Sequence, residues 1–546
     1  MVARPRTLSS SFISPRFPFG VPRGLVLADS ESRTISSLRH LLNSFRMDIC
    51  RRSFGACILA GLGASLARRA SALPPRPKLV VLVVLEQIRP DYLDAVWGQV
   101  TRGGLRRLVE NGAYFPDCRH SSSTYPHTTL ATLATAAWPA QHGIVADRWY
   151  DRKERGPVRA SADALQATTF AAEVVESPNS RVFVAAQDLS KGSIFAGTSA
   201  AHLFWMGDDG RFVTREDTPG WLADYNRVHS LLDLRNADWV ALGAKPGAAA
   251  LRKLKFDPAR PEEFLDLYRA SPFAQGALFD FAAELVSREK LGQGNTFDLL
   301  CIVSSASARL GYETGARSPL MHQMVLHLDR SVEKLLDQLD RAPGGNTYNF
   351  VLVGGHGAPT EPKPFARPRM AVDGEALAQA IQRKLTAAKT GRVEKYLYPF
   401  LYLDGGGARA PETAAAAAGR AALEEPEIAA YYTAGGECSV HNEWERRFRN
   451  SFHPLRSGDV MLSYQPEYVE DFGMNRGVSY GSLYDYDSKV PLCLFGPQFR
   501  AGVFESPIEA VDLVPTLARA IGVAPPSSST GRVLGEAFVG SEDPIR

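Results

Sequence analysis

An unbroken apolar run near the beginning of the chain constrains the fold more than any other feature. Residues 78–86 read KLVVLVVLE, with no alternation between apolar and polar side chains. A strand with one face in water alternates, so this run predicts a strand that is buried on both faces. Strands of that kind are typical of parallel sheets that are covered by helices on both sides. The run therefore favours an α/β fold.

Further strands and helices repeat the pattern along the chain. Three more apolar runs have the length of a strand: FDLLCIV at 297–303, YNFVLV at 348–353 and VPLCLF at 490–495. Apolar residues recur every three or four positions in 321–339, which is the spacing of an amphipathic helix, and we expect shorter helices at 103–111 and 511–521. This alternation of strands and helices predicts a doubly wound, mostly parallel sheet with helices on both faces.

Two longer segments interrupt the alternation. Residues 150–295 and 365–455 are richer in turns and mixed in pattern, so we expect them to be insertions that form a cap. The alanine-rich stretch 411–425 is expected to be one helix of the cap, because alanine has the highest helix propensity. A core carrying these insertions would then span residues 73–525, and residues 526–546 would form a C-terminal tail.

The first part of the chain reads as a leader. Residues 1–46 are rich in Ser, Arg and Pro without periodicity, and we expect them to lie outside the fold. Residues 47–72 contain Arg51 and Arg52, then an uncharged stretch, then Ala-Ser-Ala, which is the order of a signal peptide. The arginine pair resembles a twin-arginine export signal. About 13 apolar residues cover about 20 Å, less than a bilayer core, so we expect cleavage near Leu73 and a periplasmic protein without a membrane span.

The charge distribution argues against nucleic-acid binding. The formal net charge is +3, but residues 1–76 carry an excess of +9, from 12 Arg against 3 acidic residues, and the rest of the chain carries −6. A mildly acidic body offers no basic face to a nucleic acid. Four of the six cysteines lie beyond the leader without a Cys-x-x-Cys pair, so we expect single buried thiols, or a disulfide if the protein is exported.

Ligands bind at the carboxyl ends of strands in such sheets, and a series of recognisable blocks begins directly after the first strand. They are EQIRPDY at 86–92, WPAQHGIVADRWYDR at 138–152, SPLMHQMVLHLDRSVEKLLDQLD at 318–340, GGHG at 354–357, FHPLRSGDVML at 452–462, SYGSLYDYDSKVPLCLFGP at 479–497 and VDLVPTLA at 511–518. In this order and spacing they resemble the type I phosphodiesterase and nucleotide pyrophosphatase branch of the alkaline phosphatase superfamily. Its bacterial phosphate-irrepressible alkaline phosphatases are the most similar group.

The resemblance implies a phosphoryl-transfer site with two zinc ions. In the family, three Asp and three His hold the metals, which activate a Thr or Ser nucleophile. Glu86 stands where the first Asp is expected, and His356 keeps its place in Gly-His-Gly. Both belong to the same metal, and we interpret them as vestigial ligands.

The other positions that the family uses are substituted in this sequence. The resemblance places Ser307 or Ala308 where an Asp is expected, Tyr312 where a His is expected, Gly355 in place of an Asp and Tyr480 in place of a His. Two ligands are fewer than the three or four that hold a catalytic or structural zinc ion. We therefore expect a metal-poor pocket and no cofactor.

The nucleophile position is also altered. An alignment without gaps places Pro126 there, and a shifted one nominates Thr124 or Thr128, so Thr124 is only a weak catalytic candidate. The phosphate-binding basic residues of the bacterial phosphatases would fall within 185–195, where Lys191 is the only basic side chain, and we expect it to be solvated.

Two functions remain open. The first is a catalytically impaired or inactive homologue that binds an unknown ligand or partner in the cleft under the cap. The second is an active metal-dependent phosphomonoesterase or phosphodiesterase that uses zinc. Its ligands would then be residues outside the blocks above, such as His120, His127 or Asp147.

Overall fold

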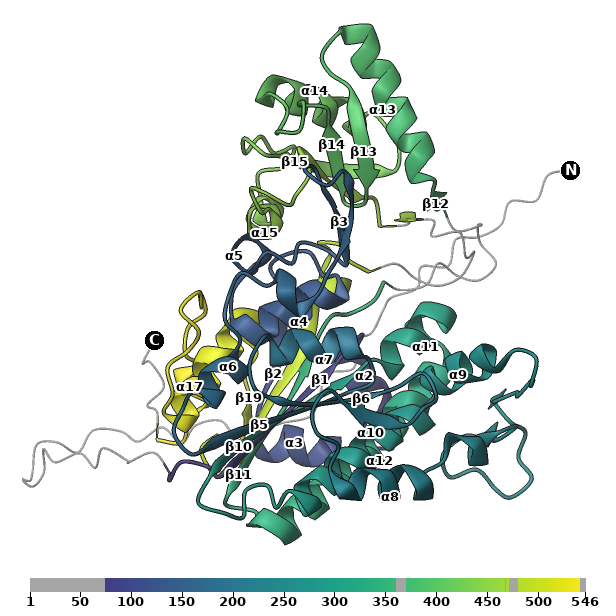
Figure 1. Cartoon of the computed structure of the whole chain (residues 1–546), viewed down its shortest axis with the longest axis vertical. Coiled ribbons are helices and arrows are strands. Elements are labelled where there is room, and N and C mark those ends of the chain that lie inside the picture. The colour runs from purple at the N-terminus through teal and green to yellow at the C-terminus, as the bar shows by residue number, and fades with distance from the viewer. Residues whose placement is uncertain (1–73, 360–369, 467, 471–479, 541–546) are drawn as a thin grey trace, which may run out of the picture. The chain divides into compact units, whose positions relative to one another are not determined.

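The structure, a computed structural model, describes residues 74–359, 370–466, 468–470 and 480–540 (Figure 1). The expected leader and signal peptide, residues 1–46 and 47–72, lie outside the described residues. No helix in the described ranges is long and apolar enough to cross a membrane. Four cysteines fall in these ranges, and all are buried and unpaired: Cys118, Cys301, Cys438 and Cys493.

A ten-stranded sheet forms the centre of the described chain, with β1 in its middle. Its strands follow the order β19 (Gly502–Val503), β2 (Ala113–Arg119), β18 (Lys489–Phe495), β11 (Tyr348–Gly354), β1 (Leu79–Leu85), β10 (Phe297–Ser304), β5 (Ser180–Ala186), β6 (His202–Met206) and β7 (Phe212–Thr214), with β20 (Ile508–Glu509) beside β2. All seven residues of β1 are buried. Parallel partners β10 and β11 flank it. The four strands predicted from apolar runs therefore share one sheet, as expected.

Helices cover both faces of this sheet (Figure 1). One face packs against α4 (Pro126–Thr135), α6 (Phe170–Val175), α7 (Leu189–Ala196) and α17 (Leu513–Ile521). The other packs against α2 (Pro90–Val96), α3 (Leu105–Asn111), α8 (Gly220–Val228), α9 (Pro261–Arg269), α10 (Pro272–Arg288), α11 (Ala306–Thr314) and α12 (Pro319–Leu339). Alternate residues of β1 belong to opposite layers: Val80, Leu82 and Val84 to one, and Leu79, Val81 and Val83 to the other. This is the predicted α/β architecture.

Part of the first expected insertion belongs to the core instead. Strands β5, β6 and β7 lie within residues 150–295, yet β5 pairs parallel with β10 and extends the central sheet. Strand β5 has seven residues, as β1 has, but it begins with Ser180 and Arg181, while β6 and β7 have only five and three residues, so none of them shows the long apolar run of β1. The short hairpins β3 (Arg148–Asp151) with β4 (Gly156–Arg159), and β8 (Asp238–Trp239) with β9 (Arg252–Lys253), do lie outside the sheet.

A second sheet with its own core lies in the later segment. It has the order β13 (Val393–Leu397), β14 (Phe400–Leu403), β16 (Val460–Tyr464) and β15 (Ile428–Thr433), and it packs against α13 (Gly374–Ala388) and α14 (Glu412–Leu423). A further parallel pair joins β12 (Met370–Val372) to β17 (Tyr468–Glu470). Helix α14 is the predicted alanine-rich helix. Its Gly419 contacts Tyr431 so closely that an added Cβ would lie 2.4 Å from the ring.

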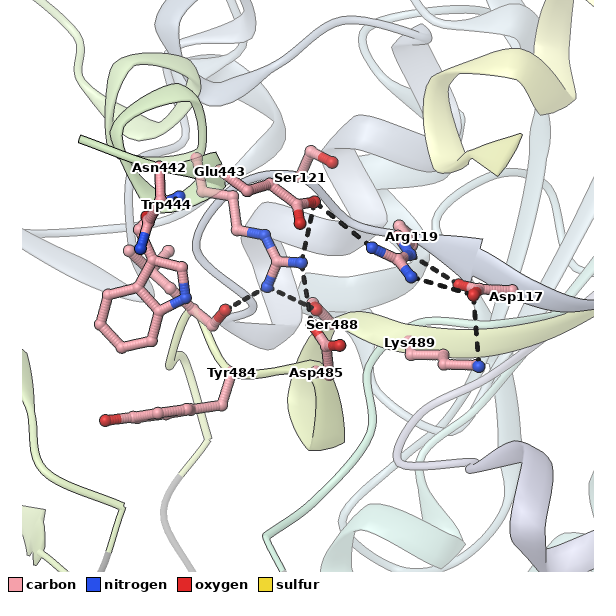
Figure 2. A network of polar contacts seen from close by, with 12 residues as sticks. Asp117, Arg119, Ser121, Asn442, Glu443, Trp444, Tyr484, Asp485, Ser488 and Lys489 are labelled. Carbon is pink, nitrogen blue, oxygen red and sulfur yellow. Dashed lines mark hydrogen bonds and ion pairs between the residues drawn. The ribbon is translucent and has the colours of Figure 1, made fainter. Parts of the chain in front are cut away.

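Polar contacts hold the segment that precedes β18, which carries Tyr484, Asp485 and Ser488 (Figure 2). Helices α5 (Pro139–His142), α15 (Glu443–Ser451) and α16 (Asp485–Ser488) complete the described helices. Arg447 of α15 is 1% exposed, donates to the carbonyl of Leu483 and pairs with Asp485 at 2.8 Å. Beside it, Arg119 pairs with Asp117 at 2.7 Å. The Arg447 contacts hold residues 483–488 against α15.

Candidate active site and its cavity

Three neighbouring strands bring the predicted residues to one edge of the sheet. Strands β1, β10 and β11 run parallel, so Leu85 lies opposite Ser304 on one side and Gly354 on the other. Glu86 and His356 follow β1 and β11, and both are completely buried. The residues that follow the three strands therefore lie close together at this edge.

Two tyrosines join this edge from elements far apart in the sequence. The ring centroids of Tyr312, on α11, and Tyr480, before α16, lie 6.3 Å apart. The Tyr480 ring also lies 5.2 Å from that of His356. Glu86, Tyr312 and Tyr480 line the same cavity. These four residues, which the resemblance assigns to the site, therefore lie close together at this edge.

The cavity at this edge has a volume of about 790 Å³. Its lining combines tyrosines with charged side chains. The described residues that line it are Glu86, Tyr125, Pro126, Ala146, Asp147, Arg148, Lys191, Asp266, Ala270, Ala308, Arg309, Tyr312, Glu313, Leu397, Tyr398, Glu470 and Tyr480. A cavity of this size has room for a small organic ligand.

Lys191 is the main difference from the expectation. It was expected to be solvated, but its side chain is only 15% exposed and its Nζ lies 2.5 Å from Oε2 of the fully buried Glu86. It also donates to the Ser305 hydroxyl at 3.2 Å. The sequence could not indicate this contact because 105 residues separate the partners. Helix α7 begins just before Lys191 and packs on β5 and β6, which places the ammonium beside the end of β1.

Opposite charges around Lys191 set its ionisation. Burial lowers the pKa of the Lys191 ammonium, but the charges of Glu86 and Asp188 outweigh it and raise that pKa above its ordinary value. Burial raises the pKa of Glu86, with Lys191 acting in the opposite direction. Burial also acts to raise the pKa of Asp188, but Lys191 and Arg309 hold it well below its ordinary value. Arg309 contacts Asp188 at 2.5 Å, so two cations and two carboxylates alternate here.

His356 lies in the protein interior, close enough to His120 for the two rings to interact electrostatically. Its Nδ1 lies 2.7 Å from the Gly357 carbonyl, which makes Nδ1 the protonated nitrogen, and its Nε2 has no hydrogen-bond partner among the described residues. Burial lowers the pKa of His356 to about 4, so the ring is neutral. Within the ranges that the structure describes, no three His, Cys, Asp or Glu side chains gather in an arrangement that could hold a metal ion.

The two small residues that the resemblance places at carboxylate positions have structural contacts. The Ser307 hydroxyl donates to the Glu86 carbonyl at 2.5 Å, which ties α11 to the end of β1. Gly355 lies beside Glu86, and a Cβ added to it would lie 3.7 Å from the Glu86 backbone and side chain. Neither residue adds a charge to the edge.

The loop expected to carry the nucleophile holds no exposed hydroxyl. Pro126 is the first residue of α4 and lines the cavity. The Thr124 hydroxyl is completely buried and donates to the Ser482 carbonyl at 2.9 Å. Thr128 is equally buried. A hydroxyl that attacks a substrate in the cavity would have to face it, and none of the described lining residues is a Ser or Thr.

A hydrogen-bonded chain that sequence reasoning missed lies at the rim. His127 Nδ1 lies 2.7 Å from Asp147 Oδ1, and His127 Nε2 lies 3.2 Å from the Ser190 hydroxyl. Sequence reasoning selected His127 and Asp147 as possible metal ligands but had no signal for Ser190, which comes from α7, 63 residues away. His120, the third of those candidates, is buried and bonds to the Gly354 carbonyl at 3.2 Å.

Comparison with known proteins connects this geometry to one family. The sequence profile of the family described as type I phosphodiesterase / nucleotide pyrophosphatase matches residues 80–470. Alkaline phosphatase PhoD of Zymomonas mobilis subsp. mobilis is 26% identical over 81% of this chain and 84% of its own length. Alkaline phosphatase PhoK of a Sphingomonas species is 26% identical over 87% of this chain and 94% of its own length.

A solved structure has the same fold. The crystal structure of wild-type alkaline phosphatase PafA superposes with a TM-score of 0.73 at 20% identity. The superposition covers 85% of this chain and 99% of that one. The described core, including the edge that carries the cavity, is therefore built on a known architecture.

Proposed function

This chain belongs to the type I phosphodiesterase/nucleotide pyrophosphatase family, and we propose that it is a member that does not carry out two-metal phosphoryl transfer and that binds a ligand in its cavity. Several relatives are named alkaline phosphatases, so hydrolysis of phosphate esters is the activity against which the proposal is tested. Fold and family define the scaffold, whereas the side chains at the site decide the chemistry.

The donor set does not fit two zinc ions. A catalytic zinc site takes three protein ligands, and each neutral His or carboxylate must present a lone pair to the metal. Here one oxygen of Glu86 is bonded to an ammonium, and His356 offers only Nε2. Tyr312, Gly355 and Tyr480 supply none of the missing His or Asp groups. We therefore assign no catalytic step to a metal.

The Lys191–Glu86 contact is the observation that carries the proposal. A buried carboxylate needs a compensating cation, and in this chain a lysine supplies it at 2.5 Å. A divalent ion beside Glu86 would have to displace this ammonium or share the carboxylate with it, at the cost of like-charge repulsion. The same side chain thus neutralises Glu86 and opposes a metal there.

Hydrolysis of phosphate esters depends strongly on metal ions, which this arrangement of charges disfavours. Its uncatalysed rate is so low that enhancements of up to about 10²¹ are needed, and two metal ions normally stabilise the attacking and leaving oxygens. One lysine that is already paired with two carboxylates does not replace four positive charges. A role in ligand binding is consistent with both the cavity and this electrostatic balance.

The proposal is tested by metal analysis and activity assays on purified protein. We expect less than stoichiometric zinc and no hydrolysis of p-nitrophenyl phosphate or bis-p-nitrophenyl phosphate above background. The proposal would be wrong if hydrolysis were present, disappeared with a chelator and returned with zinc. That result would support the metal-dependent alternative, and His120→Ala, His127→Ala and Thr124→Ala would then locate its site.

A second candidate function is metal-independent hydrolysis of a carboxylic ester, and the chain Ser190–His127–Asp147 favours it. Asp147 accepts from Nδ1, so Nε2 can accept the Ser190 proton, which are the roles of nucleophile, base and orienting acid. Ser190 is the second residue of α7, where no side chain caps the helix, so backbone N–H groups near it could stabilise an oxyanion.

Labelling with a fluorophosphonate probe separates this second candidate from the first. If it is right, the probe modifies Ser190 and not Ser193, whose hydroxyl bonds to the Leu189 carbonyl on the same helix. Ser190→Ala and His127→Ala would remove the labelling, and Ser193→Ala would not. An absence of labelling at Ser190 would leave ligand binding as the function.

Export to the periplasm forms the last part of the proposal. It rests on the arginine pair, the uncharged stretch and the Ala-Ser-Ala motif between residues 47 and 72. N-terminal sequencing of periplasmic material should find a mature chain that begins near Leu73. Material that still contains Arg51 and Arg52, or a chain found only in the cytoplasm, would contradict export.

A further inference from the structure

Two arginines lie opposite each other across the hairpin of β3 and β4. Arg148 is the first residue of β3 and pairs in register with Arg159, the last residue of β4. Residues that are opposite in an antiparallel pair point to the same side with their Cβ atoms about 5 Å apart, and like charges there repel each other. Both side chains are exposed, and neither guanidinium forms an ion pair or a hydrogen bond with another described residue. The hairpin thus holds two adjacent positive charges without a counter-charge.

The end of the hairpin that carries this pair adjoins the cavity. Arg148 and the preceding Asp147 both line the cavity. The N–H of Ala160, directly after Arg159, donates to the Asp147 carbonyl at 3.0 Å and holds the two chain segments together there. Arg155 lies in the turn at the other end of the hairpin and does not line the cavity. A ligand in the cavity therefore meets the pair of arginines at one point of the wall.

Five acidic side chains also line the cavity, and each has a partner other than Arg148. The partners are Lys191 for Glu86, Arg252 for Glu313, His127 for Asp147, the Tyr464 hydroxyl for Glu470 and, through charge alone, Arg309 for Asp266. An anion can therefore pair with Arg148 without breaking a contact inside the protein. The acids also repel each negative charge that a ligand brings, so a singly charged anion is favoured over a doubly charged one.

Aromatic rings form much of the remaining wall. Four tyrosines line the cavity: Tyr125, Tyr312, Tyr398 and Tyr480. The rings of Tyr312 and Tyr480 lie 6.3 Å apart at 54°, and those of Tyr125 and Tyr398 lie 6.4 Å apart at 66°. Rings that are tilted in this way offer faces and edges to a flat aromatic group.

From these observations we propose that the cavity binds an aromatic carboxylate, with the carboxylate at Arg148 and Arg159 and the aromatic body among the tyrosines. A guanidinium matches the two oxygens of a carboxylate, and an anion between the two arginines removes their repulsion. The Lys191–Glu86 pair stays intact, because the ligand needs neither of these two residues. This inference rests on the proposed function, since it names the class of ligand for the same cavity.

Three probes of similar shape and different charge test the proposal. Phenylacetate, its neutral analogue phenylacetamide and the mostly doubly charged benzyl phosphate are titrated into the purified protein by isothermal titration calorimetry at pH 7. We expect phenylacetate to bind about tenfold more tightly than phenylacetamide, because a hydrogen bond to a charged group is worth this much or more, and more tightly than benzyl phosphate. Equal affinity for phenylacetate and phenylacetamide, a preference for benzyl phosphate, or no binding of any probe would overturn the proposal.

Three variants of the hairpin link the binding to the named residues. Arg148→Gln should remove most of the preference for phenylacetate over phenylacetamide, and Arg159→Gln should reduce it. Arg155→Gln is the matched control, because it removes the same charge from the same hairpin outside the cavity lining, and it should bind as the parent does. Unchanged binding in Arg148→Gln, or an equal loss in Arg155→Gln, would overturn the proposal. The side chains are exposed, so we expect all three variants to fold, and thermal unfolding checks this.

The results also distinguish this inference from the function on which it rests. Zinc-dependent phosphatase activity would overturn the proposed function itself. A metal-free, inactive protein that does not prefer phenylacetate would leave the proposed function in place and remove only the aromatic carboxylate as its ligand.

Discussion

At the scale of single residues, the site is governed by how buried charges are compensated. The side chain of Glu86 is fully buried and that of Lys191 is largely buried. Each provides the nearest opposite charge to the other. Gly355 next to them adds only a hydrogen where the family has an Asp. The local balance is therefore one carboxylate against one ammonium, with Asp188 and Arg309 as a second pair beside them.

Removal of the Lys191 charge should destabilise the protein strongly. Lys191→Met leaves Glu86 buried without its cation, and we expect a loss of about 3–5 kcal/mol in the free energy of unfolding at pH 7. The double variant Lys191→Met with Glu86→Gln removes both charges and should recover most of that loss. Urea unfolding of the three proteins measures both effects. If the double variant were as unstable as the sum of the single variants, the two residues would not be coupled.

Gly355 allows a matched test of charge against size. A Cβ at this position meets only ordinary contacts at 3.7 Å, so Gly355→Ala should change stability by less than about 1 kcal/mol. Gly355→Asp places a second carboxylate beside Glu86 and should cost about 2 kcal/mol or more. It should not restore phosphatase activity, because Tyr312 and Tyr480 still occupy histidine positions. Equal unfolding free energies for the two variants would contradict this electrostatic account.

At the scale of elements, long apolar runs were predictable and contacts between distant elements were not. Strand β1 was evident from KLVVLVVLE, since only a strand covered on both faces is apolar throughout. Strands β5 to β7 were assigned to an insertion because β5 begins with two polar residues and β6 and β7 are short, so none of them shows that run. The position of Lys191 depends on how α7 packs against the sheet, which no local pattern encodes.

Two glycines within helices should respond in opposite ways to alanine. Gly419 of α14 lies against Tyr431, and an alanine Cβ would come within 2.4 Å of the ring, so Gly419→Ala should destabilise by about 1–3 kcal/mol. Gly276 of α10 has its nearest neighbour at 4.0 Å, so Gly276→Ala should stabilise by about 0.5–1 kcal/mol through the lower backbone entropy of the unfolded chain. Thermal unfolding of both variants checks the signs. A stabilising effect at Gly419 would show that α14 is less closely packed on its sheet.

At the scale of the whole molecule, family and fold followed from seven ordered sequence blocks, and the aromatic residues at the site followed from the same alignment. The arrangement of charges at the site could not be predicted from these blocks, because Lys191, Asp188 and Arg309 lie outside every block. Ser190 was missed for the same reason. Residues that a family shares can be found by alignment, while contacts between residues outside the shared blocks must be found in three dimensions.

Buried histidines should make the whole protein sensitive to acid. His142 and His453 each accept a backbone N–H bond at Nδ1, and burial lowers their pKa values to about 3 and about 4. The unfolded chain binds these protons near pH 6.5, so between pH 6.5 and 4 it holds more protons than the folded chain and stability falls as pH falls. His453→Asn keeps an acceptor for the Leu455 N–H and should reduce the loss between pH 7.5 and 4.5, by about 3 kcal/mol at most. Urea titrations at several pH values would refute this if parent and variant lost stability in parallel.

The ammonium beside Glu86 also has a consequence for how sequences of this type change over time. A return to metal binding requires Lys191 to leave, a carboxylate to appear at Gly355 and histidines to replace two tyrosines. Each of these steps taken alone leaves a buried charge unpaired or the ligand set incomplete, which costs stability without completing a two-metal site. Under the proposed function, the lysine therefore makes metal binding depend on several substitutions together, because it compensates Glu86 from within the chain.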